Sequence, residues 1–280
     1  MILPMYEQIL YEVDDPVATV TLNRPDALNA WTARMGAEVR HAVGRAERDP
    51  AVVGIVITGA GRGFCAGADM NMLAGIADGD TGAAVPDDLA VEVGRADWGD
   101  DLRGEYTYLL SVPKPVIAAI NGPVAGMGVP IALACDLRFM AVDAVLTTSF
   151  SQRGLVAEWG ISWLLPRLVG SAVALDLLFS SRKVGGEEAE RLGLVNRVLP
   201  AADVATAAQD YVRNLAERCS PTSMAIMKRQ VYQQLHAGLG PAERESQALM
   251  LESFTRRDFP EGVQSYLEKR PPAFDRLSDR

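Results

Sequence analysis

Apolar residues follow two different spacings in the first part of the chain, and together these predict two strands, a helix and a third strand. Residues 6–22 alternate between apolar and polar side chains, which is the pattern of two short strands joined by a tight turn. Apolar residues at helical spacing over 35–46 predict a helix, which Asn29 or Thr32 would cap. The β-branched run at 52–58 predicts a buried strand.

The third strand leads into residues 59–70, a stretch that contains four glycines. The same order of elements returns later, with an apolar strand at 116–120, a second glycine-rich turn at 121–128 and an apolar helix at 129–134. An extended stretch at 137–148 follows. Strand, glycine turn and helix therefore occur twice, which predicts a repeated ββα unit.

Between these two units, residues 75–104 are rich in Gly, Asp, Ala and Pro, which predicts a mobile excursion from the core. A helix at 106–110 would bring the chain back, and helical spacing dominates from residue 160 onward. The last two predicted helices are amphipathic and charged enough to cover a neighbouring subunit. Helices are expected at 201–218, 221–236, 241–256 and 260–269, after one extended piece at 194–198.

Composition excludes several classes of protein. A chain of 280 residues with 49% hydrophobic residues can fill a sizeable core, and its net charge of −9 gives no attraction to nucleic acid or to an anionic membrane. Its three cysteines are expected to be free thiols in a reducing compartment, without a metal cluster. Neither a secretory signal nor a membrane-spanning run is evident, so a cytoplasmic protein is expected.

Two glycine-rich turns indicate that backbone groups, rather than side chains, meet a ligand. Glycine allows positive φ and close approach, so such turns can offer bare N–H donors. If the two turns converge, their donors would form an oxyanion hole for a carbonyl. Pro130, tolerated in a first helical turn, places the positive end of a helix at the same point. For one glycine turn alone, a plain connecting loop is the alternative.

A dinucleotide site is the rival interpretation of the first turn, because Gly61 to Ala66 satisfies the pattern G-x-G-x-x-A. That fingerprint also needs an acidic residue at the end of a second parallel strand, about 20 residues later. Residues 83–88 are Ala-Ala-Val-Pro-Asp-Asp, and no apolar strand precedes them. We therefore do not expect a dinucleotide site.

A series of sequence blocks runs through nearly the whole chain: Asn23-Arg24-Pro25 with Leu28-Asn29-Ala30, Gly63-Phe64-Cys65-Ala66-Gly67-Ala68-Asp69, Lys114 to Gly122, Cys135-Asp136, Leu165 to Gly170, Ala189 to Val195 and Glu261-Gly262. Over roughly residues 5–275 they resemble the enoyl-CoA hydratase/isomerase (crotonase) superfamily. The resemblance implies an α/β fold, with a spiral of ββα units over 1–200 that carries the active site. A helical region at 201–280 would then serve oligomerisation, as a homotrimer or homohexamer, and closure of the CoA and acyl pocket.

The resemblance also implies that the substrate is an acyl-CoA thioester, with no permanently bound cofactor. It places the two oxyanion donors on the backbone N–H groups of Ala68 and Met127, the latter where many relatives have glycine. Arg24 and Lys228 would meet the phosphates of CoA, and Asp69 would either shape the first turn or approach the adenine. The expected CoA contacts are Arg24, Ala27, Leu28, Ala66, Asp69 and Lys228.

The proton-transfer group is the point at which the sequence departs from the family. Typical hydratases of the superfamily use two glutamates, and these positions match Pro130 and Phe150, neither of which can carry a proton. Glu158 lies among apolar residues ahead of a helix, and related isomerases and aryl-CoA dehalogenases have an acidic residue at that position. We expect Glu158 to be the general acid/base, the alternatives being a helix cap or a partner of Arg153.

One carboxylate suffices to remove a proton from one carbon and return it to another, so double-bond isomerisation is the expected reaction. Hydration by Glu158 and water is the first alternative. A catalytically silent binding or scaffold protein, including an RNA-binding one, is the second, although the acidic charge balance disfavours RNA.

Overall fold

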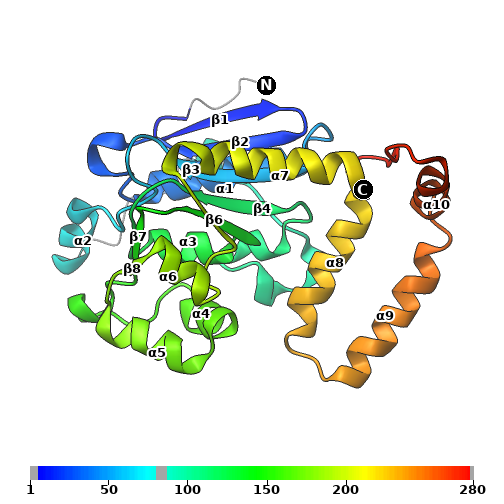
Figure 1. The fold of residues 1–280 in the computed structure, drawn as a ribbon. Helices are drawn as coiled ribbons and strands as arrows, with labels where there is room; N and C mark the ends of the chain where they lie inside the picture. The colour runs from blue at the N-terminus through cyan, green and yellow to red at the C-terminus, as the bar shows by residue number, and fades with distance from the viewer. Residues whose placement is uncertain (1–5, 80–86, 278–280) are drawn as a thin grey trace.

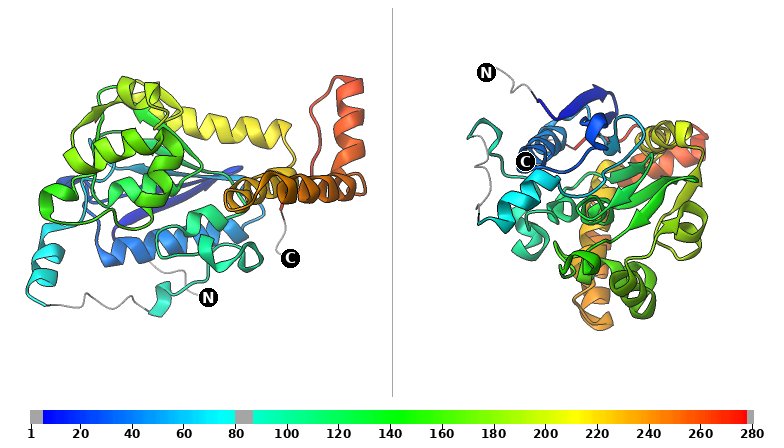
Figure 2. Two further views of the ribbon diagram at one scale, coloured as in Figure 1. Left: turned by 90° about the horizontal axis from the view of Figure 1, so that it is seen from below. Right: turned by 90° about the vertical axis from the view of Figure 1, so that its left-hand side faces the viewer.

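A computed structural model describes residues 6–79 and 87–277. Its centre is a sheet in the order β1-β2-β3-β4-β6-β9, parallel except for the antiparallel pair β1 and β2. Helix α7 covers one face of this sheet and α1 the other (Figures 1 and 2). The central strands β3 and β4 are buried along nearly their whole length, whereas most of β1 is exposed. The strands are β1 (Ile9–Asp14), β2 (Val17–Leu22), β3 (Gly54–Gly59), β4 (Val116–Ile120), β6 (Leu137–Ala141) and β9 (Arg197–Leu199).

A second, smaller sheet holds the turns that follow the central strands. Its order is β5-β7-β8, with β5 (Val124–Ala125) parallel to β7 (Val145–Thr147) and β8 (Val184–Gly185) antiparallel to β7. The predicted unit is therefore present: β4 is followed by β5 and helix α3, and β6 by β7. The α/β spiral of ββα units is confirmed.

The helices agree with the apolar spacing to within a few residues. Thr32, rather than Asn29, caps α1, because its hydroxyl accepts the N–H of Met35 at 3.0 Å. Pro130 lies in the first turn of α3, as predicted. The helices are α1 (Ala33–Arg48), α2 (Met70–Ala77), α3 (Gly128–Ala134), α4 (Ile161–Val169), α5 (Ser171–Ser180), α6 (Gly186–Arg191), α7 (Val204–Arg218), α8 (Pro221–Gln234), α9 (Leu239–Ser253) and α10 (Asp258–Glu268).

Two local predictions are wrong. The expected excursion at 75–104 is described over 75–79 and 87–104, and its second part is attached to the core by four spaced apolar side chains that are buried, Leu89, Val93, Trp98 and Leu102, although most residues between them are exposed or half-buried. Residues 80–86 of that segment lie outside the described residues. The expected helix at 106–110 is a single 3-10 turn over Tyr108–Ser111, which ends before the prolines at 113 and 115.

The C-terminal helices α8, α9 and α10 lie on the side opposite α2 (Figures 1 and 2). Helix α8 packs against the body, whereas α9 and α10 reach away from it. Helix α9 buries none of its residues. Among the described residues, no helix has both the length and the apolar character needed to cross a membrane.

Candidate active site

Two asparagines hold the first glycine turn in shape. The Asn29 amide donates to the carbonyls of Ala60 and Gly63 at 3.0 and 2.8 Å, although its own φ is +57°. From the other side, Asn121 accepts the N–H of Gly59 at 3.1 Å and donates to the carbonyl of Gly61 at 3.0 Å. Both asparagines stand in the sequence blocks quoted above, but the sequence pattern assigned neither of them a role in holding this turn.

The two glycine turns converge, as predicted. Cys65 forms an isolated parallel bridge with Val124, and the Cys65 carbonyl accepts the N–H of Ala125 at 2.9 Å. One residue further along, Gly126 faces Gly67: a Cβ on Gly126 would lie 3.4 Å from the Cα of Gly67. Both glycines have positive φ, which L side chains rarely adopt. Contact between the turns therefore depends on glycine at these two positions.

Two unused backbone donors follow these glycines directly. Within the described part of the chain, neither the N–H of Ala68 nor that of Met127 has a hydrogen-bond acceptor. Both residues line one cavity of about 590 Å³. Met127 stands immediately before α3, whose positive end adds to the field of its N–H. This arrangement can bind an oxygen that carries developing negative charge.

Glu158 lines the same cavity as Ala68 and Met127. Its side chain is half-buried, and it forms no hydrogen bond or ion pair among the described residues. Arg153 also lines the cavity, but its guanidinium donates to the carbonyl of Ser149 at 3.0 Å instead of pairing with Glu158. A carboxylate without a fixed partner thus stands in the cavity that holds the two donors.

Arg24 and Asp69 bind one another at the edge of this cavity. Arg24 Nη2 lies 2.8 Å from Asp69 Oδ2, and Arg24 Nη1 donates to the carbonyl of Ala30 at 2.6 Å. Asp69 also caps α2 by accepting the N–H of Asn71 at 2.9 Å. The hydrogen bond from Arg24 holds the pKa of Asp69 below its usual value. Asp69 therefore shapes the first turn, one of the two roles expected for it.

The remaining residues expected to contact CoA divide into two groups. Ala27 and Ala66 line the cavity. Leu28 is not among its lining residues, but its carbonyl accepts the N–H of Ala66 at 3.0 Å and so joins the two segments. Its φ of +49° is unusual for a branched side chain.

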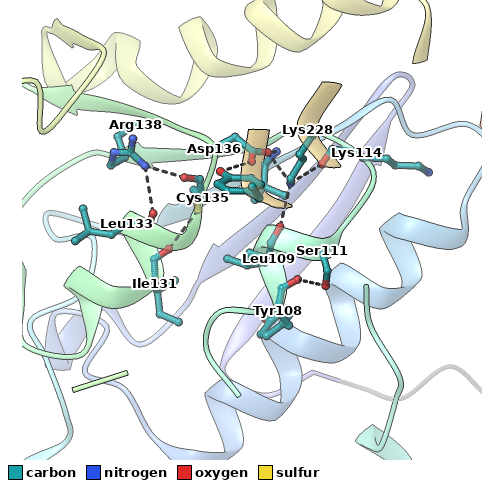
Figure 3. Close-up of polar contacts among 12 residues, drawn as sticks. Tyr108, Leu109, Ser111, Lys114, Ile131, Leu133, Cys135, Asp136, Arg138 and Lys228 are labelled. Carbon is teal, nitrogen blue, oxygen red and sulfur yellow. Dashed lines mark hydrogen bonds and ion pairs between the residues drawn. The ribbon is translucent and has the colours of Figure 1, made fainter. Parts of the chain in front are cut away.

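Lys228 lies in a different place, inside a partly buried polar cluster (Figure 3). Its Nζ donates to Asp136 Oδ2 at 2.7 Å and to the carbonyls of Leu109 and Lys114 at 2.9 and 3.2 Å. Asp136 also accepts the Tyr232 hydroxyl at 2.8 Å. All three ammonium protons of Lys228 have protein acceptors, so the structure does not support its expected contact with the phosphates of CoA.

The positions that match the two hydratase glutamates are apolar and buried. Pro130 is inside α3, and Phe150, which is 4% exposed, forms part of the cavity wall. Ser149 precedes it with a φ of +60° and lines the cavity as well. Within the described residues, no group of three or more His, Cys, Asp or Glu side chains is arranged to hold a metal ion.

Comparisons with known proteins agree with this geometry. The enoyl-CoA hydratase/isomerase family profile matches residues 12–277. The chain is 38% identical to a probable enoyl-CoA hydratase of Rhodobacter capsulatus, over 96% of this chain and 98% of that one. It is 35% identical to the 1,2-epoxyphenylacetyl-CoA isomerase of Escherichia coli, over 96% and 99%. A crystal structure of a probable enoyl-CoA hydratase/isomerase from Mycobacterium abscessus superposes with a TM-score of 0.82 at 30% identity, over 97% and 99%.

Proposed function

This chain belongs to the enoyl-CoA hydratase/isomerase family, and we propose that it shifts the double bond of an enoyl-CoA thioester with Glu158 as the single proton-transfer group. One observation carries the proposal. Of the two acidic side chains that line the cavity, Asp69 is bound by Arg24 and the N-terminus of α2, whereas Glu158 has no hydrogen-bond or ion-pair partner among the described residues.

The proposed reaction needs one carboxylate and two backbone donors. The thioester oxygen accepts the N–H groups of Ala68 and Met127, which favours the enolate. Glu158 takes a proton from the α carbon of a Δ3-enoyl-CoA, and the C–H electron pair enters the dienolate. The same carboxyl returns the proton to the γ carbon as the enolate collapses, leaving the double bond between the α and β carbons. No water or cofactor is consumed.

The test compares the wild type with Glu158→Gln on a Δ3-enoyl-CoA and on crotonyl-CoA. Glutamine keeps the size of the side chain but cannot accept the proton, so isomerisation should fall by roughly 10²–10⁴-fold while affinity for CoA esters changes little. Glu187→Gln, on exposed positions of α6, is the matched control for loss of one negative charge. Equal isomerase turnover in wild type and Glu158→Gln would refute the role of Glu158.

Hydration is the alternative that the same assay distinguishes. The relative from Rhodobacter capsulatus is described as a probable enoyl-CoA hydratase, and a carboxylate can also activate water. Faster hydration of crotonyl-CoA than isomerisation of the Δ3 ester would assign that reaction instead. If no CoA ester is bound or converted, the remaining alternative is a binding or scaffold protein.

We also propose, from the family resemblance, that the protein assembles as a homotrimer or homohexamer through its C-terminal helices. These helices expose large apolar side chains, among them Leu239 at 85%, Tyr266 at 83% and Leu267 at 74%. Such a surface is costly to leave in water and favours a partner. Sedimentation equilibrium would measure the assembly, and a monomer at micromolar concentration would contradict it.

A further inference from the structure

A second cavity of about 410 Å³ adjoins the catalytic cavity. Its wall is largely apolar and includes Leu102, Leu110 and Trp163. Of the described residues, Trp159 is the one that lines both cavities. Trp159, which is 39% exposed, therefore lies between the space that holds Glu158 and an apolar space beyond it.

The backbone fixes the direction of Trp159 in an unusual way. Its φ is +54°, and that of Gly160 is +78°. A bulky side chain at positive φ is rare and is retained where the surrounding structure enforces it. At Gly160, a Cβ would lie 2.9 Å from Cγ2 of Thr107, so glycine lets the segment at 106–107 pack closely there. The backbone conformation at Trp159 and Gly160 thus turns Trp159 toward the segment at 106–107.

Aromatic packing holds the indole in this position. The ring of Tyr106 contacts Trp159 edge to face, with centroids 4.2 Å apart, and lies 6.2 Å from the ring of Trp31 on its other side. Burial raises the pKa of Tyr106 to about 12, and the charges of Glu105 and Glu158 act in the same direction. Tyr106 is therefore a neutral, fixed support behind the indole at neutral pH.

We propose that Trp159 is the specificity-determining residue for the acyl group, and that its indole forms the end wall of the acyl pocket. This inference rests on the proposed function, because Glu158 must act at the α and γ carbons. Atoms beyond the γ carbon then meet the side chain of the next residue. Short acyl groups fit in front of the indole, and a planar ring can lie against it, whereas a long linear chain is blocked from the second cavity.

Removal of the indole should open the way into the second cavity, and saturated esters measure this without any reaction. Calorimetry with butyryl-CoA, phenylacetyl-CoA and dodecanoyl-CoA is expected to show that the wild type binds the first two more tightly than the third. In Trp159→Ala, the affinity for dodecanoyl-CoA relative to butyryl-CoA should rise by about tenfold or more, because additional methylenes become buried. Trp159→Phe, which keeps an aromatic ring, should lie between the two.

Trp163→Ala is the matched control, since it removes an indole from the second cavity but leaves Trp159 in place. In Trp163→Ala, the affinity for dodecanoyl-CoA relative to butyryl-CoA should equal that of the wild type. An unchanged ratio in Trp159→Ala, or an equal rise in Trp163→Ala, would overturn the proposal. The two proposals are tested separately. Absence of isomerisation would refute the proposed reaction, whereas the ratio of the affinities for dodecanoyl-CoA and butyryl-CoA decides the role of Trp159.

Discussion

Gly67 and Gly126 lie side by side, although 59 positions separate them in the sequence: a Cβ on Gly126 would lie 3.4 Å from the Cα of Gly67. Their φ angles are +111° and +46°, and a Cβ on Gly67 would lie 3.4 Å from the carbonyl oxygen of Ala125. Each glycine is followed at once by a residue whose N–H has no acceptor among the described residues, Ala68 in one case and Met127 in the other. The close approach of the glycines therefore sets the relative position of the two proposed donors.

Gly67→Ala should impair the reaction more than it impairs folding. A side chain at that φ costs about 1–3 kcal/mol of unfolding free energy. Displacement of the Ala68 donor should lower kcat by roughly 10²–10³-fold, the usual effect of losing one oxyanion donor. Urea unfolding and isomerase kinetics measure the two effects.

Gly170→Ala is its matched control, because Gly170 also has a positive φ, +77°, and nothing would lie within 4 Å of an added Cβ. It should lose stability through strain but keep its kcat. If kcat falls equally in Gly170→Ala and Gly67→Ala, the fall in Gly67→Ala is due to general destabilisation and not to displacement of the Ala68 donor.

Lys228→Met should destabilise the fold without weakening the binding of CoA. The substitution removes the cation from a partly buried ion pair, although the Tyr232 hydroxyl and the N–H of Val116 still donate to Asp136. Loss of a partner at a partly buried polar group costs about 1–3 kcal/mol. Chemical unfolding measures that loss, and calorimetry with CoA tests binding below the unfolding transition. A many-fold rise in the Kd of CoA, with little change in stability, would restore the phosphate contact expected from the sequence.

The sequence predicted those features that depend on local patterns. The strands β3 and β4, helix α1 and both glycine turns each follow from a run of residues with one spacing or one composition. Convergence of the turns was a condition of the oxyanion-hole hypothesis, and the structure supplies its reason: β3 and β4 are parallel neighbours, so both turns leave the same edge of the sheet. The position of Glu158 in the cavity matches the resemblance that selected it.

Features that depend on distant partners could not be predicted in this way. Trp98 and Leu102 are buried. The residues around them in the sequence have no regular apolar spacing, so the local pattern does not predict this burial. The Lys228 ammonium is bound by acceptors from residues 109, 114 and 136, which no spacing near 228 reveals. Asn29 was a possible helix cap by residue type, but its amide is used by a turn more than 30 residues away.

Glu47→Gln should stabilise the protein at neutral pH, and the gain should disappear in acid. Burial raises the pKa of Glu47 above its usual 4.5, although the N–H of Gly94 donates to the carboxylate at 2.8 Å. A raised pKa means that the folded state holds the proton more tightly, so this stabilisation is full below about pH 4.5 and is lost as pH rises through the folded pKa. Glutamine keeps an acceptor for Gly94 and has no charge to bury.

Unfolding free energies of the wild type and Glu47→Gln, measured between acid and neutral pH, test this expectation. Glu190→Gln, at an exposed position of α6, shows the effect of removing a surface carboxylate. A stabilisation by Glu47→Gln that does not vary with pH would exclude burial of the charge as its cause.

Arg24 should act on CoA binding through Asp69 rather than by touching a phosphate. Two of the five N–H donors of its guanidinium are held by Asp69 and by the carbonyl of Ala30, which fixes the orientation of the side chain toward the first turn. Arg24→Leu should therefore raise the Kd of CoA and that of 3′-dephospho-CoA by the same factor, because it releases the turn that carries Asp69 and the start of α2. A contact with the 3′-phosphate, which is the group that 3′-dephospho-CoA lacks, would instead weaken CoA alone.

A double-mutant cycle with Asp69→Asn gives the second measurement. If the two residues act as one unit, the loss of unfolding free energy in the double variant should differ by at least about 0.5 kcal/mol from the sum of the losses in Arg24→Leu and Asp69→Asn. Additive losses, together with an effect of Arg24→Leu on CoA only, would place the guanidinium at the phosphate. Equal factors for both ligands with a clear coupling energy would assign to Arg24 the positioning of the turn that presents the Ala68 N–H.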